Sequence, residues 1–143
     1  MAVRKVTVIG AGTMGSGIAQ VCAQTGWETR LYDAFSDSLD KGFSSINDFW
    51  MKGVSRGKNS EEDVKAWSKR LLRSDDMKEA LEGVDLVIEA VPEKIELKKA
   101  IFGEIEKFAP KDAILATNTS GLRISEIASA TNCPERVVGM HFF

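Results

Sequence analysis

Residues 6–15 place a short β-branched run directly before a glycine-rich turn, and an apolar-periodic helix follows that turn. The glycines have the spacing G-x-G-x-x-G. The first glycine of this pattern permits a tight turn, the second lets the backbone approach a pyrophosphate, and the third lets the helix pack closely on the strand. Backbone N–H groups at the start of the helix then face the anion. The residues that predict this phosphate-binding turn are Gly10, Gly12, Thr13, Met14 and Gly15.

A carboxylate follows the second predicted strand. Residues 28–32 read as that strand, and Asp33 comes directly after it. A carboxylate at this place accepts hydrogen bonds from the ribose hydroxyls of an adenosine, and it repels a 2′-phosphate. Together with the glycine turn, Asp33 predicts a dinucleotide site that prefers NAD to NADP. The alternative is a glycine-rich turn that binds nothing, and the strand, the helix and Asp33 weigh against it.

The chain alternates predicted strands with predicted helices. Strands are predicted at residues 5–9, 28–32, 71–73, 86–90, 113–116 and 136–140. This alternation indicates an α/β fold with a doubly wound parallel sheet of the Rossmann-like type. The segment between the second and third strands is longer than a minimal nucleotide-binding unit requires. We therefore expect a helical excursion there, which projects as a hairpin with a ligand role of its own.

Apolar side chains at helical spacing predict the buried faces of the helices. Ser60 with Asp63 predicts a capped start for a third helix, and a last helix is expected over residues 124–130. The predicted faces are Met14, Ile18, Val21 and Cys22 in the first helix, Leu39, Phe43, Ile46, Trp50 and Val54 in the second, and Leu97, Ile101, Ile105 and Phe108 in the helix before Pro110.

Composition excludes several classes of protein. The 143 residues suit one domain, and a formal net charge of −2 offers no broad field for nucleic acid. No apolar stretch approaches the length of a membrane span, and Met1 leads quickly into the first strand, so we expect a cytoplasmic protein without a targeting segment. Cys22 and Cys133 show no pairing pattern and are expected to be reduced. With one histidine in the chain, a metal site is not expected.

Polar residues fall where the later strands end, and ligands of an open parallel sheet bind outside those ends. Glu89 and Glu93 follow the fourth strand, and Asn118, Thr119 and Ser120 follow the fifth. His141 follows the sixth, and an imidazole there can take a proton from an alcohol while the Ser120 hydroxyl holds the oxygen. Beside a nicotinamide, this pair suits alcohol oxidation by hydride transfer. The plainer alternatives are a structural histidine and a helix cap formed by residues 118–121.

Five blocks of sequence together carry a family resemblance. They are G-A-G-T-M-G-S-G-I-A-Q (10–20), D-L-V-I-E-A-V-P-E (85–93), T-N-T-S (117–120), I-S-E-I-A (124–128) and G-M-H-F-F (139–143). In this order they resemble the 3-hydroxyacyl-CoA dehydrogenases, especially the bacterial and archaeal 3-hydroxybutyryl-CoA type. The resemblance implies that residues 1–143 form the NAD-binding domain of an oxidoreductase that interconverts (S)-3-hydroxyacyl-CoA and 3-ketoacyl-CoA.

The same resemblance implies roles for individual residues. Glycines 10, 12 and 15 would hold the pyrophosphate, and Asp33 would hold the adenosine ribose. His141 would be the catalytic base, and Ser120 would contact the 3-oxygen of the substrate. Arg56, with Lys58 nearby, would contact CoA, for which a solvated helix end is the alternative. The positions expected near the nicotinamide half of NAD are Glu93, Lys98 and Asn118.

This chain departs from the family at three places. Gly121 stands where a second serine is usual, and Phe49 stands at a polar position on the CoA side. The chain ends at Phe143, before the family's Asn-Pro, the glutamate that orients the histidine, and a helical domain that completes the substrate cleft and forms the dimer. We therefore expect weak or no catalysis without that half, and a homo-oligomer formed through it or through a complementary chain.

Two other functions fit parts of the sequence. A hydroxy-acid dehydrogenase of the gulonate or carnitine type also suits the blocks V-P-E (91–93) and L-K-K-x-I-F (97–102). A non-catalytic NAD-binding module, belonging to a split or structural protein, would suit the absent glutamate and helical domain. The blocks at 117–120 and 140–143 favour the acyl-CoA enzyme over both.

Overall fold

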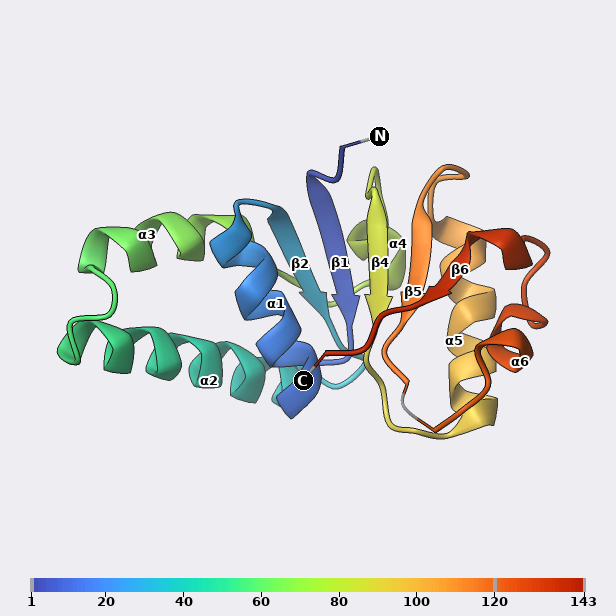
Figure 1. Ribbon diagram of the computed structural model, residues 1–143, viewed down its shortest axis with the longest axis horizontal. Helices are drawn as coiled ribbons and strands as arrows, with labels where there is room; N and C mark the ends of the chain where they lie inside the picture. Colours follow the sequence, from blue (N-terminus) through green and yellow to red (C-terminus); the bar gives the residue numbers. More distant parts are fainter. Residues whose placement is uncertain (1, 120, 143) are drawn as a thin grey trace.

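The computed structural model describes residues 2–119 and 121–142, and its centre is a six-stranded parallel sheet. The strand order is β3-β2-β1-β4-β5-β6, with helices on both faces (Figure 1). The predicted doubly wound, Rossmann-like α/β fold is therefore confirmed. The strands are β1 (Lys5–Ile9), β2 (Glu28–Tyr32), β3 (Leu71–Ser74), β4 (Leu86–Glu89), β5 (Ile114–Thr117) and β6 (Val137–Gly139).

Helices cover the two faces of the sheet as separate layers, each with its own apolar core. Successive side chains of a strand point to opposite faces, so Val8 packs with α1, α2 and α3, whereas Ile9 packs with the residues of α5 and α6. The sheet thus has a helical layer on each face, as a parallel sheet requires. The helices are α1 (Thr13–Thr25), α2 (Ser36–Ser55), α3 (Glu61–Arg70), α4 (Met77–Ala80), α5 (Ile95–Phe108) and α6 (Ile124–Ala128), with a 3₁₀ turn at Pro134–Arg136.

The predicted helical excursion is the hairpin of α2 and α3, which projects from one edge of the sheet (Figure 1). Ser60 and Asp63 form the predicted capping box at the start of α3. The indole rings of Trp50 and Trp67 lie 5.5 Å apart between the two helices. The Trp50 Nε1–H donates to Gln24 of α1 at 3.0 Å, which anchors the hairpin to the main body.

The buried face of α5 differs from the predicted one. The fully buried residues are Lys98, Phe102 and Ile105, whereas Leu97 is 37% exposed and Ile101 is half-buried. The prediction was right for Ile105 and missed Phe102, and because it counted only apolar residues it also missed the buried Lys98. Leu97 and Ile101 instead line the cavity described below.

Two smaller differences concern α1 and α6. Val21, predicted to be buried, is 52% exposed. The helix α1 packs on the sheet through a face that includes the small residues Gly15, Ala19 and Ala23, and Val21 lies outside this face. The last helix ends at Ala128, two residues before the predicted end at residue 130.

Replacing Phe102 tests the core between α5 and the sheet. Phe102 is fully buried, so Phe102→Ala should lower the free energy of unfolding by about 3–5 kcal/mol. Phe49→Ala is the matched control, because Phe49 is also helical but 61% exposed, and its loss should change stability by less than about 0.5 kcal/mol. Urea denaturation of both variants gives the comparison, and equal losses would contradict the assigned core.

Asp85 should make the stability depend on pH. Its Oδ2 accepts the backbone N–H groups of Arg4 at 2.9 Å and Lys5 at 3.0 Å, and these bonds hold the pKa of the Asp85 carboxyl below its ordinary value. A carboxyl with a lowered pKa in the folded state stabilises the fold above its unfolded pKa, and this contribution disappears as the pH falls through the folded pKa. Asp85→Asn should therefore be destabilising at neutral pH and progressively less so below about pH 4.

The measurement is urea denaturation of the wild type and the variant across that pH range. Asp112→Asn serves as control, since Asp112 is exposed. A loss of stability in Asp85→Asn that stays constant down to the acid end would contradict the proposed role of its charge.

Candidate functional site

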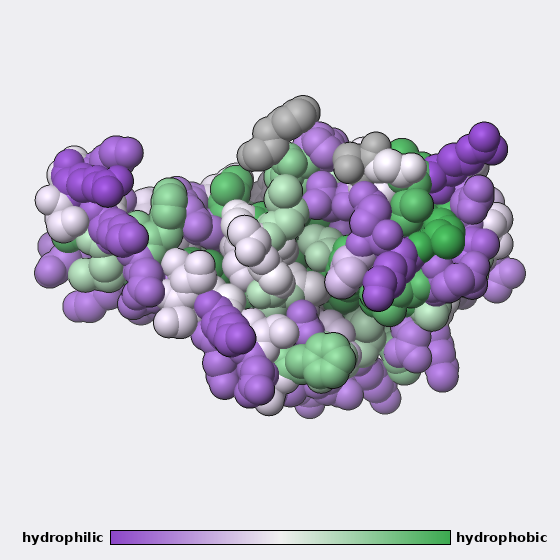
Figure 2. Space-filling view, turned by 90° about the horizontal axis from the view of Figure 1, so that it is seen from below, coloured by the Kyte–Doolittle hydropathy of each residue, from purple (hydrophilic) through white to green (hydrophobic). Residues whose placement is uncertain are grey.

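A cavity of about 760 Å³ lies at the carboxyl edge of the sheet. It is bounded by the glycine turn after β1, by the residues that follow β2 and β4, and by one side of α5. The strand order reverses between β1 and β4, which is the point where open parallel sheets bind ligands. Figure 2 views this edge of the molecule, where hydrophobic side chains lie among hydrophilic ones.

The glycine turn is shaped by close backbone contacts. Gly10 has a φ of +109°, and a Cβ on it would lie 2.7 Å from the carbonyl oxygen of Ala90. A Cβ on Gly15 would collide with the carbonyl oxygen of Gly10. A Cβ on Gly12, in contrast, would meet no atom within 4 Å, and Gly12 lines the cavity. The first and third glycines thus let backbone segments touch, and the second leaves the cavity open to a ligand.

The start of α1 faces this cavity. Thr13 and Met14, the first two residues of that helix, both line the cavity, and Met14 is 42% exposed. Residues at a helix start carry backbone N–H groups without partners inside the helix, which suits an anionic ligand.

Asp33 fixes the end of β2 to the glycine turn. Its Oδ2 accepts the N–H of Ala11 at 2.8 Å, and its Oδ1 accepts the N–H of Phe35 at 2.9 Å. An ionised carboxylate offers about four acceptor positions, so these two bonds leave acceptor capacity for ribose hydroxyls. Asp33 also lines the cavity, where a ligand can reach it.

This end of the cavity is negatively charged. Burial raises the pKa of Tyr32, and the negative charges of Glu104, Asp33 and Asp76 raise it further. Tyr32, Asp33 and Glu104 all line the cavity. An added phosphate on the ribose would be repelled by this field, which favours NAD over NADP.

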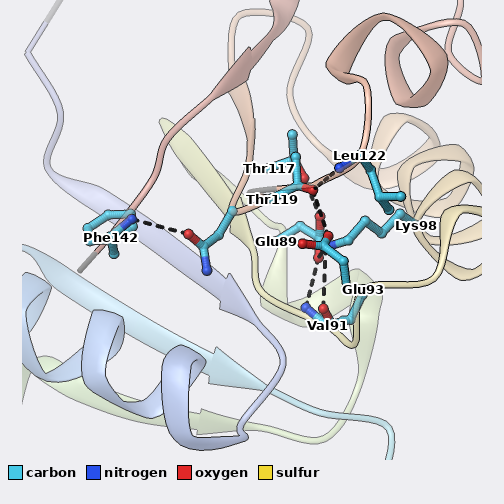
Figure 3. A network of polar contacts seen from close by, with 9 residues as sticks. Glu89, Val91, Glu93, Lys98, Thr117, Thr119, Leu122 and Phe142 are labelled. Carbon is cyan, nitrogen blue, oxygen red and sulfur yellow. Dashed lines mark hydrogen bonds and ion pairs between the residues drawn. The ribbon is translucent and has the colours of Figure 1, made fainter.

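A buried ion pair lies beside the other end of the cavity (Figure 3). The Lys98 Nζ is 2.6 Å from Glu89 Oε2, and both side chains have an exposed fraction of 0%. The Thr117 hydroxyl donates to Glu89 Oε1 at 2.6 Å, and the Val91 N–H donates to Glu89 Oε2 at 2.8 Å. Glu89 and Thr117 are direct neighbours on β4 and β5, so the register of the sheet brings them together.

A second carboxylate connects this pair to the surface. Glu93 Oε1 lies 3.5 Å from Lys98 Nζ, and the Glu93 side chain is 41% exposed. The Thr119 hydroxyl donates to the same Glu93 oxygen at 2.6 Å and accepts the N–H of Leu122 at 3.1 Å. Contacts therefore run from the core of the sheet to an exposed carboxylate and the loop after β5 (Figure 3).

The segment that carries His141 lies beside the same loop. The Met140 N–H donates to the carbonyl of Thr117 at 3.0 Å, and the Phe142 N–H donates to Asn118 Oδ1 at 3.2 Å. These two bonds hold the exposed His141 at the carboxyl edge next to β5. Ser120, the predicted contact of the substrate oxygen, lies outside the described residues.

Arg56 lies elsewhere in the molecule. It ends α2 at the outer part of the projecting hairpin, and both Arg56 and Lys58 are exposed. Neither residue lines the cavity, so the structure does not bring them together with the glycine turn, Asp33 or His141.

Sequence reasoning placed Glu89 among the polar residues at the ligand-binding edge, whereas the structure buries it as the last residue of β4, and it assigned no role to Thr117. The signal was present, because Glu89 interrupts the apolar run of residues 86–91, and a charged residue in a buried strand needs a partner. Identifying Lys98 as that partner required the packing of α5 on the sheet.

Within residues 2–119 and 121–142, no three His, Cys, Asp or Glu side chains are grouped as a metal site would require. None of the helices described is both long and apolar enough to span a bilayer.

Comparison with known proteins agrees with this geometry. Residues 5–143 match the family model described as 3-hydroxyacyl-CoA dehydrogenase, NAD binding domain. The chain belongs to the 3-hydroxyacyl-CoA dehydrogenase family. Within that family it corresponds to the NAD-binding domain, and its cavity fits this cofactor, since Gly12 leaves room for a pyrophosphate and Asp33 offers acceptors to a ribose.

Individual members of the 3-hydroxyacyl-CoA dehydrogenase family are similar to almost the whole chain. A probable 3-hydroxybutyryl-CoA dehydrogenase of Bacillus subtilis is 40% identical over 99% of this chain and 49% of its own length. A 3-hydroxyadipyl-CoA dehydrogenase of Escherichia coli is 43% identical over 99% of this chain and 30% of its own length. The crystal structure of (S)-3-hydroxybutyryl-CoA dehydrogenase PaaH1 from Ralstonia eutropha has a TM-score of 0.95 and 34% identity, over 99% of this chain and 50% of that one. The chain thus spans half or less of the length of these relatives.

Gly12, in the turn before α1, and Gly17, within α1, allow a matched test of the predicted phosphate-binding turn. A Cβ meets no atom within 4 Å at either Gly12 or Gly17, so both Gly12→Ala and Gly17→Ala should fold. Only Gly12 lines the cavity, and Gly12→Ala should weaken NADH binding by about tenfold or more, because its methyl group occupies the space of the pyrophosphate. Calorimetric titration of both variants with NADH measures this, and equal affinities would contradict the placement of the pyrophosphate.

Proposed function

We propose that this chain is the cofactor-binding part of an enzyme that interconverts (S)-3-hydroxyacyl-CoA and 3-ketoacyl-CoA by hydride transfer. One observation carries the proposal: a single edge of the sheet gathers the glycine turn and Asp33 on one side of the switch point, and Glu93, Asn118 and the His141 segment on the other. A dinucleotide that crosses the switch point would present its reactive half to the second group.

In this proposal each group has one task. The glycine turn with Thr13 and Met14 holds the pyrophosphate, and Asp33 accepts the ribose hydroxyls. The nicotinamide half lies near Glu93, Lys98 and Asn118. NAD, when bound, supplies the acceptor for hydride. The proposed substrate contacts are Ser120 and His141 at the reacting centre and Arg56 toward CoA.

The chemistry assigned to the protein is proton transfer and orientation. His141 takes the proton of the 3-hydroxyl group as the hydride leaves the 3-carbon, and it returns a proton to the oxygen in the reverse reaction. The Ser120 hydroxyl orients that oxygen. Efficient catalysis also needs a carboxylate that accepts a hydrogen bond from the imidazole and so holds it in one tautomer, because an unoriented histidine is a poor base.

We place that carboxylate, and the rest of the substrate cleft, in a helical domain that completes the enzyme. Residues 1–143 are assigned to the NAD-binding domain. The shares of the relatives that this chain covers, 49% and 30%, support such a division. Exposed apolar side chains such as Phe35, 71% exposed, and Phe49, 61% exposed, support further packing partners, including a second copy in a homo-oligomer.

The proposed substrate is an acyl-CoA thioester, as the names of the relatives state for those proteins. We propose the cytoplasm as the compartment. Both cysteines are free thiols, which is the usual state of cysteine in a reducing compartment.

The test combines binding with turnover. The chain alone should bind NADH in preference to NADPH in a calorimetric titration. Mixed with or joined to the second half of the Bacillus subtilis relative, it should reduce acetoacetyl-CoA, followed by the loss of NADH absorbance. His141→Ala should retain the NADH affinity but lose at least about a hundredfold in rate, as expected on removal of a general base.

Each part of the proposal has its own contradicting result. A chain that binds no NADH would refute the cofactor site. Turnover that survives His141→Ala would refute the proposed base, and a preference for a free hydroxy acid over its thioester would replace the acyl-CoA substrate.

A further inference from the structure

One face of α5 forms a wall of the cavity and carries a carboxylate at its end. The residues of this helix that line the cavity are Leu97, Ala100, Ile101 and Glu104. Their spacing is that of a single helix face, because residues three and four apart lie above one another. The wall is therefore apolar over two turns and then ends at the exposed side chain of Glu104.

Glu104 lies at the same end of the cavity as Tyr32 and Asp33, which both line it. Burial is the largest cause of the raised pKa of Tyr32, and the charge of Glu104 comes next, ahead of that of Asp33. Because the interaction between charges weakens with distance, this order agrees with a Glu104 carboxylate beside Tyr32. Met77 of α4 lines the cavity as well and packs into the same apolar core as Tyr32 and Ile101.

The Glu104 carboxylate is available to a ligand. Within residues 2–119 and 121–142, it takes part in no hydrogen bond or ion pair with another side chain or with the backbone. Asp33, in contrast, already accepts the N–H groups of Ala11 and Phe35. The fold thus gives Asp33 a structural task, whereas it gives none to Glu104.

The order of groups in a dinucleotide decides what this end of the cavity meets. In the proposed function the glycine turn holds the pyrophosphate and Asp33 holds the adenosine ribose. The base is attached to that ribose on the side away from the pyrophosphate, so it extends past Asp33 toward α5. The apolar side chains of Ala100 and Ile101 suit the flat face of a purine, and Glu104 then lies at its edge.

The edge of the base is the part that distinguishes one purine dinucleotide from another. The glycine turn and Asp33 contact the pyrophosphate and the ribose, which these dinucleotides share. Adenine presents an amino group at position 6, whereas guanine presents a carbonyl oxygen there, as hypoxanthine also does. An ionised carboxylate only accepts hydrogen bonds, so it pairs with the amino group and repels the carbonyl oxygen.

We infer that Glu104 is a specificity-determining residue, whose carboxylate accepts a hydrogen bond from the 6-amino group of adenine and so selects adenine over a 6-oxopurine. This inference rests on the proposed function, because it requires the adenosine to lie at Asp33. A site that binds an amino group rejects an analogue without it, since the polar group of the site then stays unpaired.

The test compares NADH with reduced nicotinamide hypoxanthine dinucleotide, which differs from NADH only at position 6 of the purine. The variants are Glu104→Met, which removes the acceptor at similar length, and Glu104→Gln, which exchanges the carboxylate for an amide. Glu96→Met is the matched control, because Glu96 belongs to the same helix, its side chain is 86% exposed, and it does not line the cavity. All of these side chains are exposed, so the variants should fold.

Calorimetric titration gives the dissociation constants. The wild type and Glu96→Met should bind NADH at least about tenfold more tightly than the hypoxanthine analogue, as expected for a hydrogen bond to a charged group. Glu104→Met should bind NADH more weakly and reduce this preference to less than about threefold. Glu104→Gln should keep the NADH affinity and gain affinity for the analogue, because an amide can accept from an amino group or donate to a carbonyl.

The outcomes separate the inference from the proposed function. If the wild type binds NADH and the hypoxanthine analogue equally well, or if Glu104→Met keeps the full preference, the role of Glu104 is refuted and the proposed function stands. A Glu104→Met variant that weakens both ligands by the same factor also refutes it, because the side chain then does not read the base. If the wild type binds neither ligand, the proposed function fails and the inference fails with it.

Discussion

The close approach of three backbone segments at the end of β1 is the constraint on which the rest of this structure depends. Gly10 leaves the central strand with a positive φ, Gly15 brings α1 against the Gly10 carbonyl, and Ala90 of the neighbouring turn packs on Gly10. A side chain at either glycine would push α1 or the turn after β4 away. The floor of the cavity, the start of α1 and the Ala11 N–H that Asp33 binds are all set by this packing.

The second organising element is electrostatic and lies on the far side of the switch point. The sheet accepts a charged residue at the end of β4 because Thr117, Val91 and Lys98 supply it with donors from a strand, a turn and a helix. Removing one partner would leave the carboxylate buried without compensation, which is strongly destabilising. The same contacts make the relative positions of β4, β5 and α5 specific at the edge where a ligand binds.

The sequence was sufficient where local chemistry decides the structure. The bounds of β1 and β2 were predicted without error, because a β-branched run ends at the glycine turn and the second strand ends at Asp33. The capping box of Ser60 was also confirmed. Prediction was incomplete for α5, where Ile105 is buried as expected but an apolar pattern cannot identify a buried lysine whose partner comes from another element. The sequence placed Arg56 on the projecting helical segment, and it lies there, apart from the cavity, but the direction in which the hairpin projects could not be predicted.

The double use of Asp33 has a consequence for protein engineering. A change of cofactor from NAD to NADP requires removal of the carboxylate after the second strand, because this carboxylate occupies the place of the 2′-phosphate and repels it. In this chain that carboxylate also accepts the N–H groups of Ala11 and Phe35. A cofactor exchange here is therefore a redesign of the loop as well as of the charge, and the replacement at position 33 must keep an acceptor for both amides.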